Sequence, residues 1–477
     1  MMDSNTVLDI FREITKIPRE SGHEEAMTAY LQQFAAQRHL ECKTDSTGNV
    51  VIVKPAAPGK ENVPTLVLQG HQDMVCEKIK GSAHDFTRDP IDYVIEDGWM
   101  IAKETTLGAD DGIGVAACLA LLDSDLPTGR LECLFTISEE TGMDGAMALE
   151  AGFITGKTLI NLDSEDEGEM FVGCAGGVNT MAEFHYSEEP LRPGYETVLL
   201  YLFNAVGGHS EDDINKERAN MVQQMARFLY GEIDGEMQLL WLSGGGKHNA
   251  IARECEALVA VPSDQVEALK ARFAAFGAAL KKEFAVSDPD LRCNAVSREA
   301  DRLAMDPAVA RKLVYALTAV HHGVLAMSQD IPGLVETSSN LASVRMDKPG
   351  LVEICTSQRS ASETGKRFVA DKVAACFRLA GAQVRTGDPY PGWKPDMQSH
   401  ILKVCVDSYE RLFGEKPKVK AIHAGLECGL FLEKFPGLDM ISFGPTLRGV
   451  HAPGEKLDLA SNERFVRHLV DVVTHFE

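Results

Sequence analysis

The sequence has few basic residues for its length. Its 477 residues include 47 Lys and Arg against 71 Asp and Glu, which gives a formal net charge of −24. Surfaces that bind nucleic acid are rich in Lys and Arg, so this balance disfavours nucleic acid as a partner. We expect two to four domains, because one domain typically has roughly 100 to 200 residues.

Long apolar segments are also missing. The longest, such as 115–122, are far shorter than the ~20 residues that a membrane-spanning helix needs. The N-terminal segment MMDSNTVLDIFREITKIP has the spacing of an amphipathic helix and lacks the basic region and apolar stretch of a secretion signal. The 11 cysteines show no C-x-x-C spacing, which favours reduced thiols over a disulfide framework. We therefore predict a cytoplasmic protein with no membrane partner.

Apolar segments of strand length alternate with helical segments up to about residue 180. Strands are expected near 50–53, 65–69, 131–137 and 158–162, and helices near 24–40 and 111–122. Apolar strands separated by helices indicate a mostly parallel sheet covered on both faces. The predicted fold class is α/β.

The pattern changes between 184 and 390, where alternating strands such as 197–203 accompany long helices such as 264–284. After residue 390 the α/β texture resumes, with a helix near 399–413 and a strand near 438–443. We therefore predict an α/β domain in two parts, 1–183 and 391–477, interrupted by an inserted α+β domain at 184–390. A weak echo between 248–255 and 339–346 suggests two related halves within the insertion.

Several acidic residues and one histidine follow the expected strands. His71 and Asp73 come directly after the strand at 65–69, where open α/β sheets bind their ligands. Taken alone, a His-x-Asp sequence is more typical of a hydrogen-bonded structural histidine. Adjacent acids also occur at 110–111, before a helix, and at 139–140, after a strand, and one more acid at 163 ends another strand. Any one of these could be a helix cap or a solvated loop.

Together these acids favour a metal site. Carboxylates combined with imidazole and without thiolate suit Zn²⁺, Mn²⁺ or Co²⁺, and shared carboxylates are typical of a site for two divalent ions. His451 lies in a Gly- and Pro-rich loop of the returning α/β segment and is a further candidate ligand. Three competing motifs are excluded. The glycines at 112 and 114 mimic a dinucleotide-binding fingerprint, but acids rather than an apolar strand precede them. The phosphate-binding loop is incomplete at 246–248, and the G-x-S-x-G motif of serine hydrolases does not occur.

Five motifs resemble those of the di-zinc exopeptidases, a family that includes carboxypeptidase G, aminoacylase and bacterial dipeptidases. They are GHQDMV (70–75), LGADDG (107–112), SEETG (138–142), NLDSED (161–166) and GVHAPGE (449–455), in the family's order. The large insertion, together with FVGCAGG, GGHSEDDI and HAGLECGLF, is similar to the lid of the aminoacyl-histidine dipeptidases within that family. The resemblance covers essentially the whole chain and implies a catalytic domain with an inserted lid domain.

The resemblance also implies roles for individual residues. Asp110 would bridge two divalent ions, most simply Zn²⁺, with Mn²⁺ and Co²⁺ as alternatives. His71 and Asp163 would bind one ion, and Glu140 and His451 the other. Asp73 would brace His71, because a ligating imidazole needs its second ring nitrogen fixed. Glu139 would be the general base for the water that bridges the metals, and the peptide bond after Asp110 is expected to be cis.

In the lid, the resemblance points to His209, Asn249 and Arg359 as substrate-binding residues. Arg359 can present a bidentate fork to a dipeptide carboxylate, and the other two can donate to an oxyanion. Two alternatives stay open: Asn249 could cap a turn, and Arg359 could pair with Glu363 four residues later. Glu427 would help to fix the substrate's amino group, although a turn-forming role fits equally well.

The expected function is metal-dependent hydrolysis of small dipeptides, preferably of the Xaa-His type that includes carnosine-like molecules. An N-acyl amino acid deacylase or a carboxypeptidase of the same family is an alternative, since the metal motifs specify amide hydrolysis and not the flanking side chains. A non-catalytic peptide-binding protein is a third, which the retained Glu139 disfavours. A homodimer is compatible with these expectations.

Overall fold

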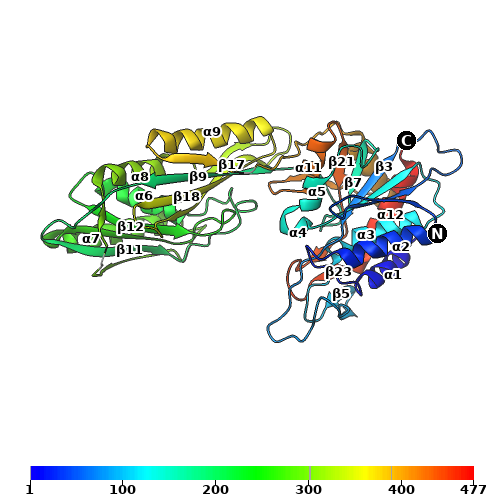
Figure 1. Ribbon diagram of the computed structural model, residues 1–477, viewed down its shortest axis with the longest axis horizontal. Helices are drawn as coiled ribbons and strands as arrows, with labels where there is room; N and C mark the ends of the chain where they lie inside the picture. Colours follow the sequence, from blue (N-terminus) through cyan, green and yellow to red (C-terminus); the bar gives the residue numbers. More distant parts are fainter. Residues whose placement is uncertain (1, 300–301, 388) are drawn as a thin grey trace. The chain divides into compact units, whose positions relative to one another are not determined.

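The computed structural model describes residues 2–299, 302–387 and 389–477. Contacts divide the chain into two compact units. The first comprises Met1–Cys174, Trp393–Ala421 and Leu426–Glu477, and the second comprises Ala175–Gly392 and Ile422–Gly425. In Figure 1 the first unit carries the blue, cyan, orange and red parts of the chain and the second the green and yellow parts. The second unit is therefore an insertion into the first.

The first unit is built on an eight-stranded sheet. Its strands, in spatial order, are β1 (Glu41–Thr44), β2 (Val50–Lys54), β6 (Leu131–Thr136), β3 (Leu66–His71), β7 (Thr158–Asn161), β21 (Asp439–Ser442), β8 (Glu169–Cys174) and β20 (Lys418–Ile422). The central four, β6, β3, β7 and β21, are parallel to one another. Strands β1, β2 and β8 pair antiparallel toward the edges. Strands β3 and β6 are buried along their whole length, as expected for central strands covered on both faces.

The helices of the first unit pack in two groups. They are α1 (Ser4–Ile14), α2 (Glu25–Gln37), α3 (Ala109–Leu122), α4 (Glu139–Gly142), α5 (Asp144–Ala148), α10 (His400–Phe413), α11 (Glu427–Lys434) and α12 (Leu459–His475). Beyond Asp110 and Asp111 in its first turn, helix α3 is apolar on every side, and it is fully buried, in contact with α1 and β3. Helix α12 joins α1 and α10, whereas α11 packs on α5 and β8. The α/β fold class is confirmed.

A small antiparallel sheet lies beside the main one in the first unit. It contains β22 (Leu447–Arg448), β23 (Lys456–Asp458), β5 (Trp99–Ala102) and β4 (Tyr93–Glu96). Because β22 and β23 pair antiparallel, the segment between them forms a tight connection. That connection carries His451.

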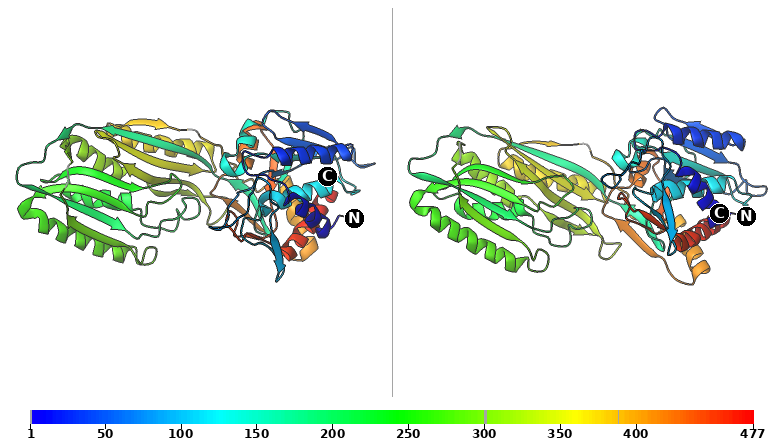
Figure 2. Two further views of the ribbon diagram at one scale, coloured as in Figure 1. Left: turned by 60° about the horizontal axis from the view of Figure 1, so that its bottom comes forward. Right: turned by 90° about the horizontal axis from the view of Figure 1, so that it is seen from below.

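In its described residues, the second unit combines a nine-stranded sheet with four α-helices. Its strands include β9 (Gly176–His185), β11 (Tyr195–Phe203), β12 (Gln238–Gly245), β13 (Cys255–Pro262), β14 (Arg292–Ser297), β16 (Gly323–Met327), β17 (Val335–Arg345), β18 (Leu351–Ser360) and β19 (Gln383–Thr386). The helices are α6 (Met221–Glu232), α7 (Val266–Glu283), α8 (Pro307–Ala319) and α9 (Glu363–Leu379). Apolar residues from all four helices share one core with the sheet, and Figure 2 shows this α+β arrangement from two more directions.

Most expected elements are present, with local differences. The helix expected at 264–284 begins at Val266, after a short 3₁₀ turn. The echo segments differ: 248–254 is a loop that precedes β13, whereas 339–345 lies inside β17. None of the described helices combines the length and apolar character needed to cross a membrane.

Candidate metal centre

The strand ends of the first unit bring the candidate ligands together. His71 is the last residue of β3, and Glu140 lies in α4 just after β6. Asp163 follows β7 by two residues, and Asp110 lies in the first turn of α3. His451 comes from the connection between β22 and β23, at the other end of the sequence. The parallel topology explains this gathering, because the carboxyl ends of parallel strands meet at one edge of a sheet.

Asp110 lies between two imidazoles. Its Oδ1 is 3.1 Å from Nε2 of His71, and its Oδ2 is 3.1 Å from Nε2 of His451. Asp163 Oδ1 lies 3.5 Å from the same nitrogen of His71, and Glu140 Oε2 lies 2.8 Å from that of His451. The five side chains thus form two groups that share one carboxylate: His71, Asp110 and Asp163, and Asp110, Glu140 and His451.

The chemistry of these donors fits divalent cations. Imidazole nitrogen and carboxylate oxygen are ligands that Zn²⁺, Mn²⁺ and Co²⁺ accept, and each group offers three such atoms within 4.8 Å of one another. Oε1 of Glu140 is buried and has no hydrogen-bond partner among the described residues, so it is available as a ligand. A third grouping, of His71 with Glu139 and Glu140, places the expected base beside the same cluster.

The pKa values of two of the acids, Asp163 and Glu139, are raised. Burial, with the negative charge of Asp110 added, holds the pKa of Asp163 well above its usual value. Burial and the nearby acids Glu427 and Glu140 raise the pKa of Glu139 to about 8. Such crowding of carboxylates favours bound cations, whose charge offsets the repulsion.

The pKa values of the two histidines are raised as well, because the neighbouring carboxylates favour the charged imidazolium. Contacts with Asp110 and Glu140 raise the pKa of His451 to about 10. Although burial works against it, the neighbouring Asp163 and Asp110 raise the pKa of His71. The carboxylates that surround the two imidazoles are thus the same ones that offer oxygen ligands to cations.

Asp73 contacts both His71 and the turn that carries Glu139 and Glu140. Its Oδ1 is 3.3 Å from Nδ1 of His71 and accepts the backbone N–H of Glu139 at 3.1 Å. Its Oδ2 accepts the backbone N–H of Glu140 at 3.2 Å and the Ser21 hydroxyl at 2.7 Å. Burial alone would raise the pKa of Asp73, but these bonds, led by His71, lower it to about 2. Asp73 thus holds both the imidazole and the turn that carries the two glutamates.

Glu455 is a buried residue of the site that the sequence analysis did not single out. Its carboxylate accepts the backbone N–H groups of Leu107, Gly108 and Ala109 at 2.7, 3.0 and 2.8 Å. The peptide bond between Asp110 and its successor is cis, as expected. Glu455 belongs to the same GVHAPGE motif as His451, so its place in that motif could have identified it from the sequence as a candidate site residue.

Arg19 supports the same loops from the N-terminal part of the chain. Its guanidinium donates to the carbonyl oxygens of Gln72 and Asp73 at 3.0 and 2.6 Å, and also to that of Gly108. The residue is 2% exposed. A single arginine in the segment IPRESG carries no sequence signal for this role, because its three acceptors lie 53 to 89 residues away.

Glu427 lies in the interior of the first unit, in the first turn of α11. Its Oε2 accepts the Gln69 amide at 2.7 Å and the Thr136 hydroxyl at 2.9 Å. Its Oε1 is buried and has no partner among the described residues. Burial raises the pKa of Glu427 to about 7. Its role as a substrate-binding residue stays a prediction.

The second unit brings the three predicted substrate-binding residues into one cluster. Nδ2 of Asn249 lies 2.9 Å from Nε2 of His209. Arg359 is 5% exposed and pairs with Glu211, which also contacts His209. The alternative partner Glu363 instead binds Lys366 and the backbone of residue 392.

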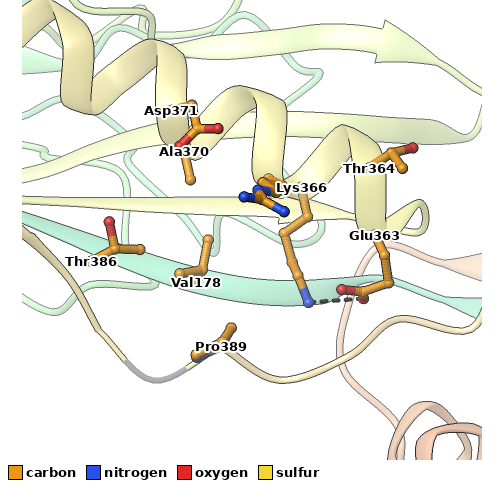
Figure 3. Close-up of a pocket in the computed structure, with 9 residues that line it drawn as sticks. Val178, Glu363, Thr364, Lys366, Ala370, Asp371, Thr386 and Pro389 are labelled. Atoms are coloured by element: carbon orange, nitrogen blue, oxygen red, sulfur yellow. Dashed lines mark hydrogen bonds and ion pairs between the residues drawn. The ribbon is translucent and has the colours of Figure 1, made fainter.

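A cavity of about 510 Å³ lies elsewhere in the second unit, along α9. Figure 3 shows Lys366 and Glu363 joined across its edge, with Val178 and Thr386 on the facing strands. None of the site residues predicted from the sequence lines this cavity.

Comparison with known proteins identifies the family. The model of peptidase family M20/M25/M40 matches residues 67–475. The chain is 40% identical over 455 residues to the cytosol non-specific dipeptidase of Escherichia coli, covering 95% of this chain and 94% of that protein. Aminoacylhistidine dipeptidase from Vibrio alginolyticus has a TM-score of 0.93 and 39% identity, covering 99% of this chain and 96% of that one. An aminopeptidase from Bacillus cereus shares the fold, with a TM-score of 0.63 at 16% identity over 99% of this chain and 98% of that one. The family resemblance inferred from the motifs is thus confirmed, and this chain belongs to peptidase family M20/M25/M40.

Proposed function

We propose that the protein is a metal-dependent dipeptidase that prefers dipeptides of the Xaa-His type. The observation that carries the proposal is Asp110, whose two oxygens each lie 3.1 Å from a different imidazole, those of His71 and His451. A carboxylate in this position can be shared by two divalent ions. Relatives named as a cytosol non-specific dipeptidase and an aminoacylhistidine dipeptidase support the substrate class and a cytoplasmic location.

We assign His71, Asp110 and Asp163 to one metal position and Asp110, Glu140 and His451 to the other. Bound divalent ions would polarise the scissile carbonyl and lower the pKa of a water molecule. Zn²⁺ is the first candidate, with Mn²⁺ and Co²⁺ as alternatives, because all three accept mixed nitrogen and oxygen ligands.

Glu139 is the proposed general base. Burial raises its proton affinity, so it can take a proton from the attacking water and later give that proton to the leaving amine. Asp73 holds the backbone N–H of Glu139 and the imidazole of His71 at the same time, and so fixes the base relative to the ligands. Asp73 therefore has a positioning role.

We further propose that His209, Asn249 and Arg359 bind the substrate. The support is their association in one cluster of the second unit and the fork geometry of a guanidinium, which suits a carboxylate. Glu427 remains the candidate partner of the substrate's amino group.

A substrate panel tests the proposal. The metal-free protein, reloaded separately with Zn²⁺, Mn²⁺ or Co²⁺, should be assayed with Xaa-His dipeptides, other dipeptides, tripeptides and N-acetyl amino acids. We expect hydrolysis of dipeptides with a preference for C-terminal His. Faster turnover of N-acetyl amino acids would assign a deacylase instead, and preferential trimming of longer peptides would assign a carboxypeptidase. Binding without turnover of any of them would indicate a peptide-binding protein.

A further inference from the structure

Glu211 occupies two of the donors proposed for the substrate. It lies two residues after His209, in the loop GGHSEDDI. Its Oε1 forms an ion pair with Nη2 of Arg359, and its Oε2 lies 3.2 Å from Nδ1 of His209. Both oxygens of this carboxylate are therefore engaged, one by each donor.

His209 is held from both sides of its ring. Nδ2 of Asn249 lies 2.9 Å from Nε2. Nδ1 faces both the backbone N–H of Glu211, at 3.4 Å, and the Oε2 atom of the same residue, at 3.2 Å. A carboxylate oxygen only accepts, so the contact with Oε2 is a hydrogen bond when Nδ1 carries the ring proton.

The guanidinium of Arg359 is only partly satisfied. Its Nη2 is taken by Glu211 and its Nη1 donates to the hydroxyl of Tyr390 at 2.6 Å. Its Nε is buried and lacks a hydrogen-bond partner among the described residues. A bidentate carboxylate uses Nε and Nη2 together. A carboxylate that takes this fork therefore competes with Glu211 for Nη2.

Glu211 is more exposed than its partner Arg359 and is held by fewer contacts than its neighbour Asp213. Its side chain is 20% exposed, against 6% for that of Arg359. Within the part of the chain that the structure describes, its carboxylate contacts Arg359 and His209, whereas the neighbouring carboxylate of Asp213 is held by Lys216, Arg218 and a backbone N–H.

We propose that Glu211 is a specificity-determining residue, an internal carboxylate that competes with the substrate's free carboxylate for Arg359 and His209. This inference rests on the proposed function, because it takes the ligand of Arg359 to be a carboxylate. Displacement leaves the charge of Glu211 without its partners, so a bound residue whose side chain is cationic or donates hydrogen bonds gains relative to an apolar one. The competition thus favours dipeptides that end in His or Lys over those that end in Leu.

Binding of amino acids tests the proposal without relying on turnover. Titration calorimetry on the metal-loaded protein should compare L-leucine with L-leucinamide, which lacks the carboxylate. We expect Glu211→Gln to bind leucine ~10-fold more tightly, as expected from losing a competing charge-assisted contact, and to gain far less for leucinamide. Glu211→Ala should shift both affinities in the same direction. Unchanged or weaker leucine binding in both folded variants would overturn the proposal.

Two controls sharpen the comparison. Asp212→Asn removes the same charge from the next, exposed position and should leave the affinity for leucine within about twofold of the unsubstituted protein. In an Arg359→Ala background, Glu211→Gln should no longer improve leucine binding; a persistent gain would mean that Glu211 acts through general charge and would overturn the proposal.

Kinetics separate this inference from the proposed function. With dipeptide substrates, Glu211→Gln should lower KM for Gly-Leu more than for Gly-Lys, and an equal effect on both would overturn the stated preference. If the unsubstituted protein hydrolyses no dipeptide, the proposed function fails. The leucine titration then still decides whether Glu211 competes with a ligand's carboxylate for Arg359.

Discussion

Glu455 Oε1 accepts the backbone N–H of Ala109 at 2.8 Å, across 346 residues of sequence. The contact ties the segment that carries His451 to the loop that carries Asp110. A carboxylate that accepts several backbone N–H groups fixes a loop more firmly than one side-chain contact would. The proposed bridging ligand is thus held in place by a residue that touches no metal position itself.

This relationship predicts the effect of Glu455→Gln. Glutamine keeps the shape but replaces one acceptor oxygen by a donor, which would face the N–H groups of the loop. We expect divalent-ion affinity to fall roughly 10- to 100-fold, as when outer partners of metal ligands are changed. Titration calorimetry on metal-free protein measures this loss. Glu433→Gln, an exposed position in α11, is the matched control, and an equal loss in both variants would contradict the role of Glu455.

Metal removal should abolish activity and lower stability together. The crowded carboxylates around Asp163 and Glu139 repel one another when no cation is bound, and an ion that binds only the folded protein stabilises it. An ion present at about 100 times its Kd would add about 2.7 kcal/mol. We expect chelation to lower Tm and to end hydrolysis, with both restored by Zn²⁺, Mn²⁺ or Co²⁺. Full activity at verified trace metal content would exclude the mechanism.

Glu139→Gln should separate metal binding from catalysis. Glutamine cannot accept the proton of the attacking water, so kcat should fall by about 10²- to 10⁴-fold. The metal content, measured by elemental analysis, should stay at the unsubstituted level, because the proposed ligands remain. A variant with near-normal kcat would assign the base to another residue.

Arg359→Ala should weaken dipeptide hydrolysis more than it affects metal content. Loss of a charge-assisted contact removes roughly 1.5 to 3 kcal/mol, which corresponds to one to two decades in kcat/KM. Dipeptide amides lack the carboxylate, so they should lose little further in the variant. Arg367→Ala, an exposed change on α9, is the control. Equal losses for acid and amide substrates would mean that Arg359 supports the fold instead.

His468 predicts a dependence of stability on pH. Burial lowers its pKa to about 4, and its Nε2 lies 2.9 Å from the carbonyl oxygen of Cys405. Because the folded protein disfavours the charged form, the contribution to stability is complete above the unfolded pKa of about 6.5 and is lost as the pH falls toward the folded value. Between about pH 7.5 and about pH 5.5 this loss amounts to about 1 kcal/mol.

Denaturant unfolding at these two pH values, in the presence of a chelator, measures the effect. His468→Gln keeps a donor for the carbonyl but does not titrate, so its free energy of unfolding should fall less than that of the unsubstituted protein. His475→Gln, exposed near the end of the same helix, should fall as the unsubstituted protein does. The same pH dependence in all three proteins would show that His468 carries no part of it.

The sequence by itself determined the class of the fold and the ligand candidates. Strands at 66–71, 131–136 and 158–161 are mostly apolar. His71 ends the first of them, and Glu139 and Asp163 follow the other two. Local hydrophobic patterning carries this information, because a strand that is buried on both faces needs mostly apolar residues and its end must return to polar surroundings.

Only the tertiary structure decided which distant residues meet. His451 lies 3.1 Å from Asp110, 341 residues away, and Glu211 rather than Glu363 pairs with Arg359. No periodicity encodes such contacts, because they depend on the order of strands in a sheet and on the paths of connecting loops. Long-range packing is set by the whole chain, whereas helix and strand patterns are set within a few residues. The sequence therefore supplied the donors, and the fold supplied their partners.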